Sequence, residues 1–458
     1  MRGVWTVADI RQAERKQAHE PLMARAATGL ARRCTTMLSS VYGARVLLLI
    51  GSGANGGDAL LAGAQLARRG AQCSALLLSE RYHAEGMAAF RAAGGRIVST
   101  VVPADLVIDG IVGIGGTGGL RSPLPELPEA PVIAVDLPSG VDADTGAVPG
   151  LALKADVTVT FGCLKPGLVA GEGAQYAGQV DVVDIGFELP EPRLWVADIG
   201  DVAARWPWPR TGDDKYSRGV VGIAAGSRRY PGAGVLAVGG ASAGPAGYIR
   251  YAGAGASAVR DHHPHVVTTD RLADAGRVQA WVVGPGLSLD SPGQADLRTA
   301  ILEQVPLCLD ADALTLIAAH PGWLEGREKP LVLTPHDGEY ERLAGHPPGP
   351  DRVAAARDLA ARMNATVLLK GPRTVIADPD GTAFVNPTGT PALATAGTGD
   401  VLAGLLGSLL AGGVEPIWAA VCAAYVHGLA GQHAARSGPV TASDVAAALR
   451  PVVSSLLS

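Results

Sequence analysis

Short apolar runs that end in glycine- or aspartate-containing turns recur along the whole chain. The clearest is Arg45–Ile50 (RVLLLI), which leads into a glycine-rich turn and then into helical sequence at 59–69. Runs of strand length that are apolar throughout are typical of parallel strands buried on both faces and covered by helices. The pattern therefore predicts an α/β protein. Further strands are predicted at 75–78, 106–108, 132–135, 157–161 and 180–183, and in the second half at 220–224, 280–283, 307–309, 331–333, 366–369 and 374–376.

A proline-rich segment interrupts this pattern near the middle of the chain. The 458 residues are too many for one ordinary hydrophobic core, so two or three domains are expected. Pro190, Pro192, Pro207 and Pro209 stand among tryptophans, and prolines at this density interrupt helices and strand ladders. We predict a linker at 191–211 between two αβα sandwich domains, 1–190 and 212–458. Residues 1–40 have helical character and are expected to pack across the first sheet.

Charge and cysteine usage narrow the classes of partner. A formal net charge of −5 gives no electrostatic basis for binding nucleic acid, which leaves metabolites as the natural partners. Five scattered cysteines contain no Cys-x-x-Cys pair, so we interpret them as reduced and mostly buried. The N-terminus lacks a signal-peptide core, and the longest apolar stretches are too short and glycine-rich to span a bilayer. We expect a cytoplasmic protein that does not bind membranes and forms a homo-oligomer.

Three polar turns follow predicted strands of the first half. They are the segments 51–58 (GSGANGGD), 109–119 (DGIVGIGGTGG) and 135–142 (VDLPSGVD). The carboxyl ends of neighbouring parallel strands share one crevice, where ligands bind. Asn55, Asp109 and Ser139 would bring oxygen ligands suited to a hard cation, and Asp136 would offer a carboxylate for proton transfer. The alternatives are an ordinary strand-to-helix turn at 51–58 and a capping role for Asp136.

These three segments, in this order, resemble the NAD(P)HX epimerase family, whose substrates are hydrated forms of NADH and NADPH, over residues 1–190. The resemblance implies a Rossmann-like αβα domain, a potassium ion near Asn55, Asp109 and Ser139, and contact between Asp136 and the hydrated nicotinamide ring. The chain departs from the family pattern at Ala54 and Ala59, where asparagine and glycine are usual. The implied substrate-binding residues are Ala54, Asn55, Gly56, Gly57, Asp58, Gly113, Ile114, Gly115, Gly116, Thr117, Gly118, Gly119 and Asp136.

The second half contains a stronger motif at 396–400 (AGTGD), which leads into an apolar helical sequence. Backbone amides at a helix N-terminus can hold a phosphoryl group, and the carboxylate of Asp400 could take a hydroxyl proton. The alternative is that Asp400 merely caps the helix. Lys370 follows the predicted strand at 366–369 and could meet nucleotide phosphates, whereas His336 could be a ligand residue or a loop histidine paired locally with Glu339.

Together with the segments 284–286 (GPG), 334–339 (TPHDGE) and 370–374 (KGPRT), this motif resembles the ADP/ATP-dependent NAD(P)HX dehydratases, which have the ribokinase-like fold. The resemblance implies Asp400 as catalytic base, ADP as phosphate donor and Mg²⁺ at the phosphates. The chain departs from it at Pro245, which should end or kink a helix. The implied nucleotide-binding residues are Lys370, Gly371, Pro372, Arg373, Thr374 and Gly399, and the implied substrate-binding residues are Gly234, Gly286, His336 and Asp400.

The two resemblances predict a bifunctional repair enzyme. It would interconvert the R and S epimers of hydrated NADH and NADPH and dehydrate the S epimer, with conversion of ADP to AMP and phosphate. Two alternatives remain open on the sequence: a small-molecule kinase of the ribokinase superfamily, and an N-terminal half that only binds nucleotides or a partner protein.

Overall fold

A computed structural model describes residues 1–15, 19–116, 119–120 and 124–456 of the chain. It divides into two compact units, Arg2–Leu194 and Trp195–Ser458, with Met1 belonging to the second. Each unit contains a largely parallel sheet, so the predicted α/β class is confirmed.

The N-terminal unit is built on a parallel sheet of strand order β4-β3-β2-β5-β6-β7-β8. The chain runs outward from β2 to β4 and then returns to β5, so the strand order reverses between β2 and β5. Its strands are β2 (Arg45–Ile50), β3 (Gln72–Leu77), β4 (Arg96–Val98), β5 (Leu106–Gly110), β6 (Val132–Val135), β7 (Val157–Phe161) and β8 (Gln179–Val183). Its helices are α1 (Val7–Glu14), α2 (His19–Met37), α3 (Ala54–Arg68), α4 (Ala84–Ala92) and α5 (Pro166–Val169), and β1 (Arg2–Val4) begins the unit.

The two faces of this sheet are covered differently. Val46, Leu48 and Ile50 of β2 point to one face, where they pack with apolar residues of α2, α3 and α4. Leu47 and Leu49 point to the other face, where they pack with apolar residues outside the helices, among them Val101, Val102, Ala104, Leu124 and Leu127. Because successive side chains of a strand point to opposite faces, one apolar run contributes to both layers. The described residues between β5 and β6 form no helix, so helices alternate with strands less regularly than expected.

The C-terminal unit has a larger sheet, in which seven parallel strands run in the order β12-β11-β10-β13-β14-β15-β16 and two antiparallel strands, β17 and β18, follow β16. Its strand order reverses between β10 and β13. These strands are β10 (Val220–Ala224), β11 (Tyr248–Ala252), β12 (Val267–Thr269), β13 (Ala280–Val283), β14 (Leu307–Leu309), β15 (Leu331–Leu333), β16 (Thr366–Leu369), β17 (Val375–Ala377) and β18 (Ala383–Val385).

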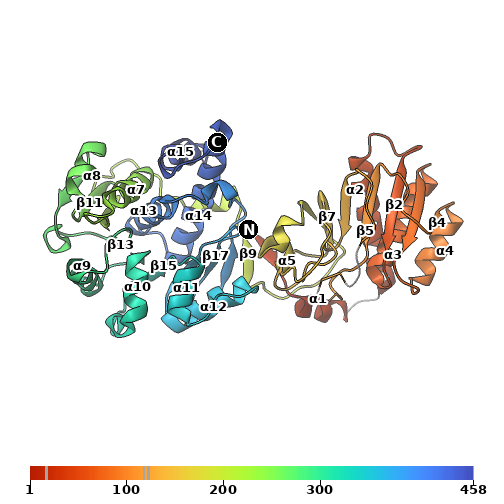
Figure 1. Ribbon diagram of the computed structural model, residues 1–458, viewed down its shortest axis with the longest axis horizontal. Helices are drawn as coiled ribbons and strands as arrows, with labels where there is room; N and C mark the ends of the chain where they lie inside the picture. The colour runs from red at the N-terminus through yellow and green to blue at the C-terminus, as the bar shows by residue number, and fades with distance from the viewer. Residues whose placement is uncertain (16–18, 117–118, 121–123, 457–458) are drawn as a thin grey trace. The chain divides into compact units, whose positions relative to one another are not determined.

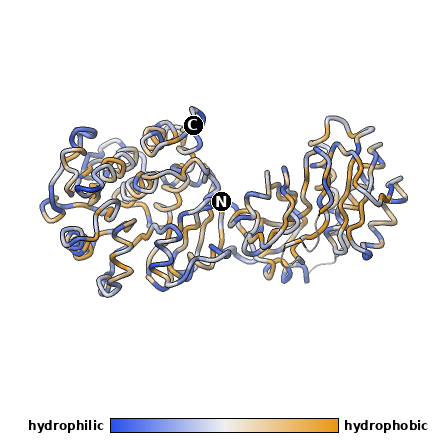
Figure 2. The backbone as a smooth tube through the Cα atoms, viewed as in Figure 1, coloured by the Kyte–Doolittle hydropathy of each residue, from blue (hydrophilic) through white to orange (hydrophobic). Residues whose placement is uncertain are grey.

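Helices cover both faces of this second sheet (Figure 1). The first group packs into the main core of the unit and comprises α7 (Pro231–Ala243), α13 (Thr398–Ala411), α14 (Pro416–Ala434) and α15 (Ala442–Ser455). The second group comprises α9 (Ser291–Leu302), α10 (Asp312–Ala319), α11 (Asp337–Ala344) and α12 (Arg352–Met363), and α8 (Ala256–His262) follows β11. Figure 2 shows the strands as mostly hydrophobic and the outer helices as mixed, as burial on both faces requires.

Most of the segment predicted as a linker is part of the folded C-terminal unit. Within 191–211 lie β9 (Leu194–Val196) and α6 (Ile199–Arg205), which begins with a capping box between Asp198 and Asp201. Val202 and Trp206 are buried in the core of that unit. The prolines that suggested a linker lie before and after this seven-residue helix, where they do not interrupt its hydrogen bonds.

The five cysteines are free and buried, in agreement with the expected reduced state. Pro245 follows the end of α7, whose last residue is Ala243, so the helix stops before the proline as predicted.

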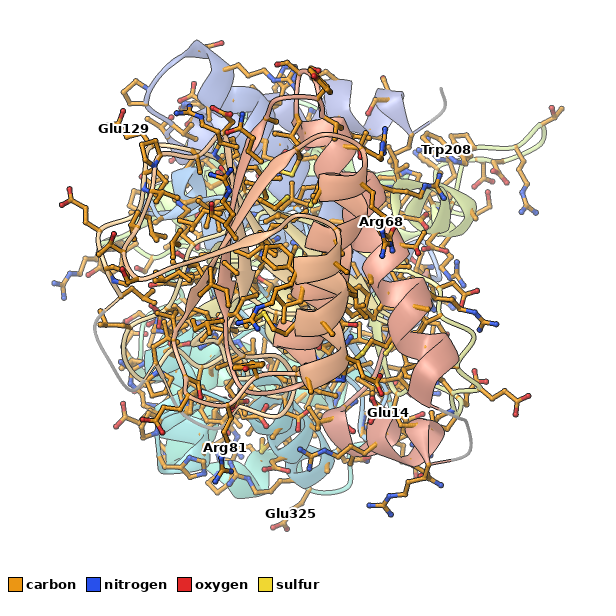
Figure 3. The ribbon with its side chains drawn as sticks, turned by 90° about the vertical axis from the view of Figure 1, so that its right-hand side faces the viewer. Glu14, Arg68, Arg81, Glu129, Trp208 and Glu325 are labelled. Carbon is orange, nitrogen blue, oxygen red and sulfur yellow. The ribbon has the colours of Figure 1, made fainter. Side chains whose placement is uncertain are left out.

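Charged side chains such as Arg68, Arg81 and Glu129 lie on the outside of the N-terminal unit (Figure 3). Among the described helices, none combines the length and apolar character needed to cross a membrane.

Candidate active sites

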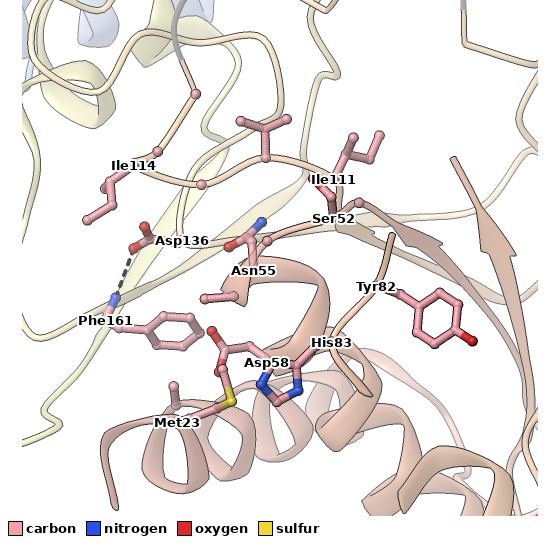
Figure 4. A pocket seen from close by; sticks show the side chains of 18 of the residues that line it. Met23, Ser52, Asn55, Asp58, Tyr82, His83, Ile111, Ile114, Asp136 and Phe161 are labelled. Carbon is pink, nitrogen blue, oxygen red and sulfur yellow. Dashed lines mark hydrogen bonds between the residues drawn. The ribbon is translucent and has the colours of Figure 1, made fainter. Parts of the chain in front are cut away.

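The N-terminal unit contains a cavity of about 1260 Å³ at the point where its strand order reverses. The turn after β2 and the segment after β5 line it, together with residues of α1 and α2 and residues at or after the ends of β3, β7 and β8. Figure 4 shows Asn55 and Asp58, both from the first turn of α3, and Asp136, from the turn after β6, directed into this space. The reversal of strand order leaves the carboxyl ends of β2 and β5 uncovered by a crossover connection, and ligands of α/β proteins bind at such points.

The first turn of α3 brings two buried polar side chains to the cavity. Asn55 Nδ2 and Asp58 Oδ1 have no hydrogen-bond partner among the described residues. Burial, and to a lesser extent the charge of Asp136, raises the pKa of Asp58 to about 8. Polar atoms that are buried without a partner cost free energy, so their presence at a cavity indicates that a ligand satisfies them.

A second group of oxygen atoms lies beneath the cavity, where Asp109 of β5 meets Ser139 of the turn after β6. The Ser139 hydroxyl donates to Asp109 Oδ1 at 2.6 Å and the Ser139 N–H donates to Asp109 Oδ2 at 2.8 Å. Ser139 Oγ also accepts a hydrogen bond from the N–H of Val112, next to Gly113. A Cβ atom at Gly113 would stand 2.8 Å from Asn55 Oδ1, so only glycine allows the chain to approach Asn55 so closely. The structure thus places Asp109 and Ser139 in direct contact, and it places Asn55 beside Gly113, the residue after Val112, whose N–H donates to Ser139.

Asp136 is held in a buried ion pair with Lys165, a residue that the sequence analysis did not identify. Lys165 is 1% exposed, and its ammonium donates to Asp136 Oδ1 at 2.6 Å, to Thr160 Oγ1 at 2.8 Å and to the carbonyl of Phe161 at 2.8 Å. Asp136 itself has a positive φ of 66°, a backbone conformation that non-glycine residues rarely adopt. Its carboxylate is therefore committed to Lys165 and Thr160 and faces the cavity, which argues against a role as a helix cap.

Most of the residues implied for the first site line this cavity: Ala54, Asn55, Asp58, Gly113, Ile114, Gly115, Gly116, Gly119 and Asp136. Gly56 and Gly57 lie in the same turn of α3 without lining the cavity, and Thr117 and Gly118 fall outside the described residues. Ala54 is exposed at the first position of α3, whereas Ala59 is fully buried against Gly110.

The second site lies at the N-terminus of α13. Gly397 has a positive φ of 89° and precedes the helix, whose first turn contains Thr398, Gly399 and Asp400. Burial is the main cause that raises the pKa of Asp400 to about 7; the negative charge of Asp310 adds to it and the positive charge of Lys370 opposes it. A carboxyl group with this pKa can exchange a proton near neutral pH, as a general base requires.

Lys370, which follows β16, forms ion pairs with residues that follow two neighbouring strands, β14 and β15, close to the N-terminus of α13. Its ammonium lies 2.7 Å from Asp310 Oδ1, after β14, and 3.5 Å from Glu339 Oε2, in α11 after β15. A Cβ atom at Gly399 would lie 3.6 Å from Lys370 Nζ, so the lysine stands directly beside the first turn of α13. The neighbouring charges of Asp310 and Glu339 raise the pKa of Lys370 against the opposing effect of burial. The ammonium therefore remains charged where an anionic phosphate would lie.

His336 acts as the N-cap of α11 and its side chain is 55% exposed. Its Nδ1 accepts hydrogen bonds from the N–H groups of Gly338 and Glu339, and the Glu339 carboxylate accepts from the His336 N–H, which forms a capping box. The local pairing that the sequence left open is thus present, and the exposed edge of the ring remains available to a ligand.

The other residues implied for the second site occupy the same end of the sheet. Arg373 donates to the carbonyl of Pro387, and Gly371 packs against Arg352. Gly286 has a positive φ and lies against Tyr230 and Ala233 at the start of α7. Gly234 lies inside α7 rather than in a loop, and a Cβ atom there would contact the ring of Tyr251.

Lys165 and Asp310 were both missed, although the sequence contains a signal for each. Asp310 directly follows the apolar run at 307–309, in the position where Lys370 follows 366–369. Lys165 is a single lysine within an apolar segment that begins with the strand at 157–161. A charged residue within or just after a buried strand needs a partner, which makes both residues candidates for a site.

Comparison with known proteins agrees with this division. The family model described as NAD(P)H-hydrate dehydratase matches residues 221–450, and the model described as YjeF-related protein N-terminus matches residues 19–167. The bifunctional NAD(P)H-hydrate repair enzyme of Mycobacterium tuberculosis is 49% identical over 397 residues, which cover 83% of each chain. The chain belongs to the bifunctional NAD(P)H-hydrate repair enzymes. The enzyme of that name from Mycobacterium leprae is 48% identical over 401 residues, again with 83% of each chain covered.

For the C-terminal half, the repair-enzyme family also has a related solved structure. It is the ADP/ATP-dependent NAD(P)H-hydrate dehydratase from Bacillus subtilis, co-crystallised with ATP and Mg²⁺. It is 29% identical, covers 57% of this chain and 97% of its own, and has a TM-score of 0.53. A ribokinase-like superfamily protein from Enterococcus faecalis, 24% identical with a TM-score of 0.53, has the same fold and covers 59% of this chain and 98% of its own. The predicted ribokinase-like fold and both family resemblances are confirmed. Membership of the repair-enzyme family favours the repair function over the kinase alternative.

Proposed function

We propose that the chain repairs hydrated NADH and NADPH, with epimerisation in the N-terminal unit and nucleotide-dependent dehydration in the C-terminal unit. The observation that carries this proposal is the environment of Asp400. Its carboxyl group stands at the N-terminus of a helix, beside a charged lysine, and has a pKa of about 7. The relatives that match both halves of the chain are named for the same pair of activities.

In the dehydratase step, the Asp400 carboxylate takes the proton from the C6 hydroxyl of the S epimer. The hydroxyl oxygen then forms a bond to the terminal phosphorus of ADP, and the bond between that phosphorus and the bridging oxygen breaks, which releases AMP. The phosphate ester is a far better leaving group than hydroxide. Loss of phosphate from C6 and of a proton from C5 restores the dihydropyridine ring. Positioning and charge stabilisation account for most of the catalysis of such transfers.

Lys370 and the amides of the first turn of α13 would hold the phosphates in this step. Gly399 lies directly beside the Lys370 ammonium, because a Cβ atom at this position would already be in van der Waals contact with Lys370 Nζ, at 3.6 Å. The carboxylates of Asp310 and Glu339 are buried beside this lysine and are hard oxygen ligands of the kind that Mg²⁺ prefers, so these residues fit a magnesium–nucleotide complex. When bound, Mg²⁺ would neutralise negative charge on the phosphates. We favour ADP over ATP as the donor.

In the epimerase step, Asp136 and Lys165 would move protons at the hydrated carbon of the ring. The Lys165 ammonium donates to three oxygen atoms, one of them on Asp136, so the geometry of the pair does not depend on bound substrate. The unpartnered Asn55 Nδ2 and Asp58 Oδ1 lie in the same cavity and would bind polar groups of the substrate.

The residues around Asp109 fit a potassium ion. Asp109 is fully buried, and among the described residues its side-chain hydrogen bonds come from Ser139 and Ile111, with no cationic side chain. Burial raises the pKa of Asp109 to about 6, so its charge is poorly compensated by the protein. A monovalent cation held by Asp109, Ser139 and Asn55 would supply that charge and fix the wall of the cavity.

Recovery of absorbance at the reduced-nicotinamide band tests the function directly. Mixed-epimer hydrated NADH is incubated with the full chain and either ADP or ATP. Complete recovery with stoichiometric release of AMP or ADP is expected and identifies the phosphate donor. Recovery that stops at the S fraction would limit the chain to dehydration, and no recovery with either nucleotide would contradict the proposal.

We also propose a cytoplasmic location and a homo-oligomeric assembly. The substrates are intracellular cofactors, and five free, buried cysteines suit a reducing compartment. Light scattering of the purified full chain tests the assembly, for which a monomeric mass would be the contrary result.

A further inference from the structure

The N-terminal cavity extends well beyond the residues that would act on the ring. Asp136 and Lys165 occupy one end, whereas Leu78, Ser79 and Tyr82 line the other, after β3. Figure 4 shows Tyr82 and Asp136 on opposite sides of the pocket, with Ser52 and Asn55 between them. A cavity of about 1260 Å³ is larger than one nucleotide half of a dinucleotide needs.

The end after β3 is apolar and open. Leu78 is 38% exposed and Tyr82 is 39% exposed, which makes both of them exposed large hydrophobic residues. They stand next to the glycine-rich turn, because β3 is the parallel neighbour of β2 and the N–H of Leu78 donates to the carbonyl of Ile50. An aromatic ring and a leucine at the mouth of a ligand cavity form a surface on which a purine base can stack.

The middle of the cavity has the character of an anion site. Gly53 is the N-cap of α3 and offers no side-chain cap, so the first N–H groups of the helix are left uncapped. Gly53, Ala54 and the unpartnered Asn55 and Asp58 side chains all line the cavity at this turn. Helix N-termini of this kind bind phosphate groups in dinucleotide-binding folds.

We propose that the adenosine half of the dinucleotide substrate lies over Leu78 and Tyr82, with its diphosphate at the first turn of α3 and the hydrated ring at Asp136. This inference rests on the proposed epimerase function. The orientation follows from chemistry, since the buried aspartate–lysine pair can move protons, whereas Leu78 and Tyr82 offer only apolar surface. His83 also lines the cavity, but its Nδ1 is occupied by the N–H of Gly86. An adenine base needs no acid or base group, only a flat apolar surface and space.

The test compares two substrates that differ only in the adenosine half: hydrated NADH and the hydrate of reduced nicotinamide mononucleotide. Interconversion of R and S epimers is followed directly in the full chain for the wild type, Tyr82→Ala and Tyr82→Phe. Tyr42→Ala is the matched control, because Tyr42 is 83% exposed in the same unit and does not line the cavity. Loss of a base-stacking aromatic should lower kcat/KM of Tyr82→Ala for hydrated NADH about tenfold, mostly through KM.

Three results are expected together. Tyr82→Ala should leave kcat/KM for the mononucleotide hydrate unchanged, Tyr82→Phe should retain wild-type values on both substrates, and Tyr42→Ala should affect neither. Equal losses on both substrates would show that Tyr82 acts through the fold, and no loss on either would place adenosine elsewhere; both outcomes overturn the inference. If the wild type epimerises neither substrate, the proposed epimerase function fails and the inference fails with it.

Discussion

In both units a lysine ammonium is paired with an aspartate at the carboxyl ends of parallel strands. The paired aspartate is the residue proposed to transfer protons in the N-terminal unit, but not in the C-terminal unit. In the N-terminal unit, Lys165 is bound to Asp136, the residue proposed to move protons. In the C-terminal unit, Lys370 is bound to Asp310, and the proposed base Asp400 stands nearby without being its ion-pair partner.

The two arrangements represent two ways in which a protein can make a carboxylate suitable for proton transfer. A buried aspartate in contact with a lysine keeps a fixed orientation, and the lysine ammonium beside it can donate a proton. Such a pair suits a step in which protons move in both directions. A half-buried aspartate without such a contact has a pKa near neutrality, as Asp400 has, and can take a proton when a hydroxyl is presented. The following predictions test this contrast.

Asp400→Asn should have the largest effect, because the amide cannot accept the hydroxyl proton. We expect dehydration of the S epimer to fall about a thousandfold, with epimerisation unchanged. Absorbance recovery with ADP measures the first activity and direct R/S analysis the second. Glu325→Gln changes an exposed carboxylate of the same unit outside the site motifs, so it is the control and should retain both. Normal dehydration by Asp400→Asn would remove that residue from the mechanism.

Lys165→Met should show the opposite selectivity. It leaves the Asp136 carboxylate buried without its cation, so we expect epimerisation to fall about a hundredfold and the N-terminal unit to lose about 3–5 kcal/mol of stability. Thermal unfolding and R/S analysis at a temperature where the variant is folded measure the two effects. Lys154→Met changes an exposed lysine of the same unit and should be neutral. A folded Lys165→Met variant with full epimerase activity would show that the pair is only structural.

Replacement of potassium by tetramethylammonium should lower epimerisation about tenfold while dehydration changes little. The reason is the buried Asp109 carboxylate, which has no cationic side chain beside it among the described residues. Ser139→Ala should weaken the response to added potassium by removing one oxygen ligand. Equal sensitivity of both activities to potassium would disagree with a site confined to the N-terminal unit.

The rate of dehydration should rise with pH up to about 7, because the reaction needs Asp400 in its carboxylate form and the pKa of Asp400 is about 7. Asp310→Asn removes a negative charge that raises this pKa, so the acid limb of the profile should move to lower pH. The epimerase profile of the same variant provides the control. An acid limb that stays in place or moves to higher pH would contradict the proposed coupling.

Ala54→Asn should have the smallest effect. Ala54 is exposed at the cavity, so an amide there could add one hydrogen bond to the substrate and raise epimerase kcat/KM about twofold. Ala59→Gly, at a buried position against Gly110, is the comparison and should lower stability instead. A decrease in epimerase activity in Ala54→Asn would show that the alanine suits this cavity.

The amino-acid sequence alone was enough to predict the α/β class, most of the strands of both sheets and the turns that carry the sites. The strands β4, β11, β12 and β18 were not predicted. These features depend on local information: apolar runs of strand length, and glycine and aspartate at positions where strands end. The family resemblance, carried by the order of the turn motifs, was equally contained in the sequence, and the comparisons confirmed it.

The identity of the residues that form the buried ion pairs became clear from the three-dimensional structure alone. Lys165 lies 29 residues from Asp136 and Asp310 lies 60 residues from Lys370, so no local pattern shows that either pair is in contact. The structure also decided that the proline-rich segment contains a capped helix, because burial of Trp206 stabilises a segment whose composition suggests a linker. Ion pairs and burial depend on neighbours across the sheet, and those neighbours are fixed by strand order rather than by position along the chain.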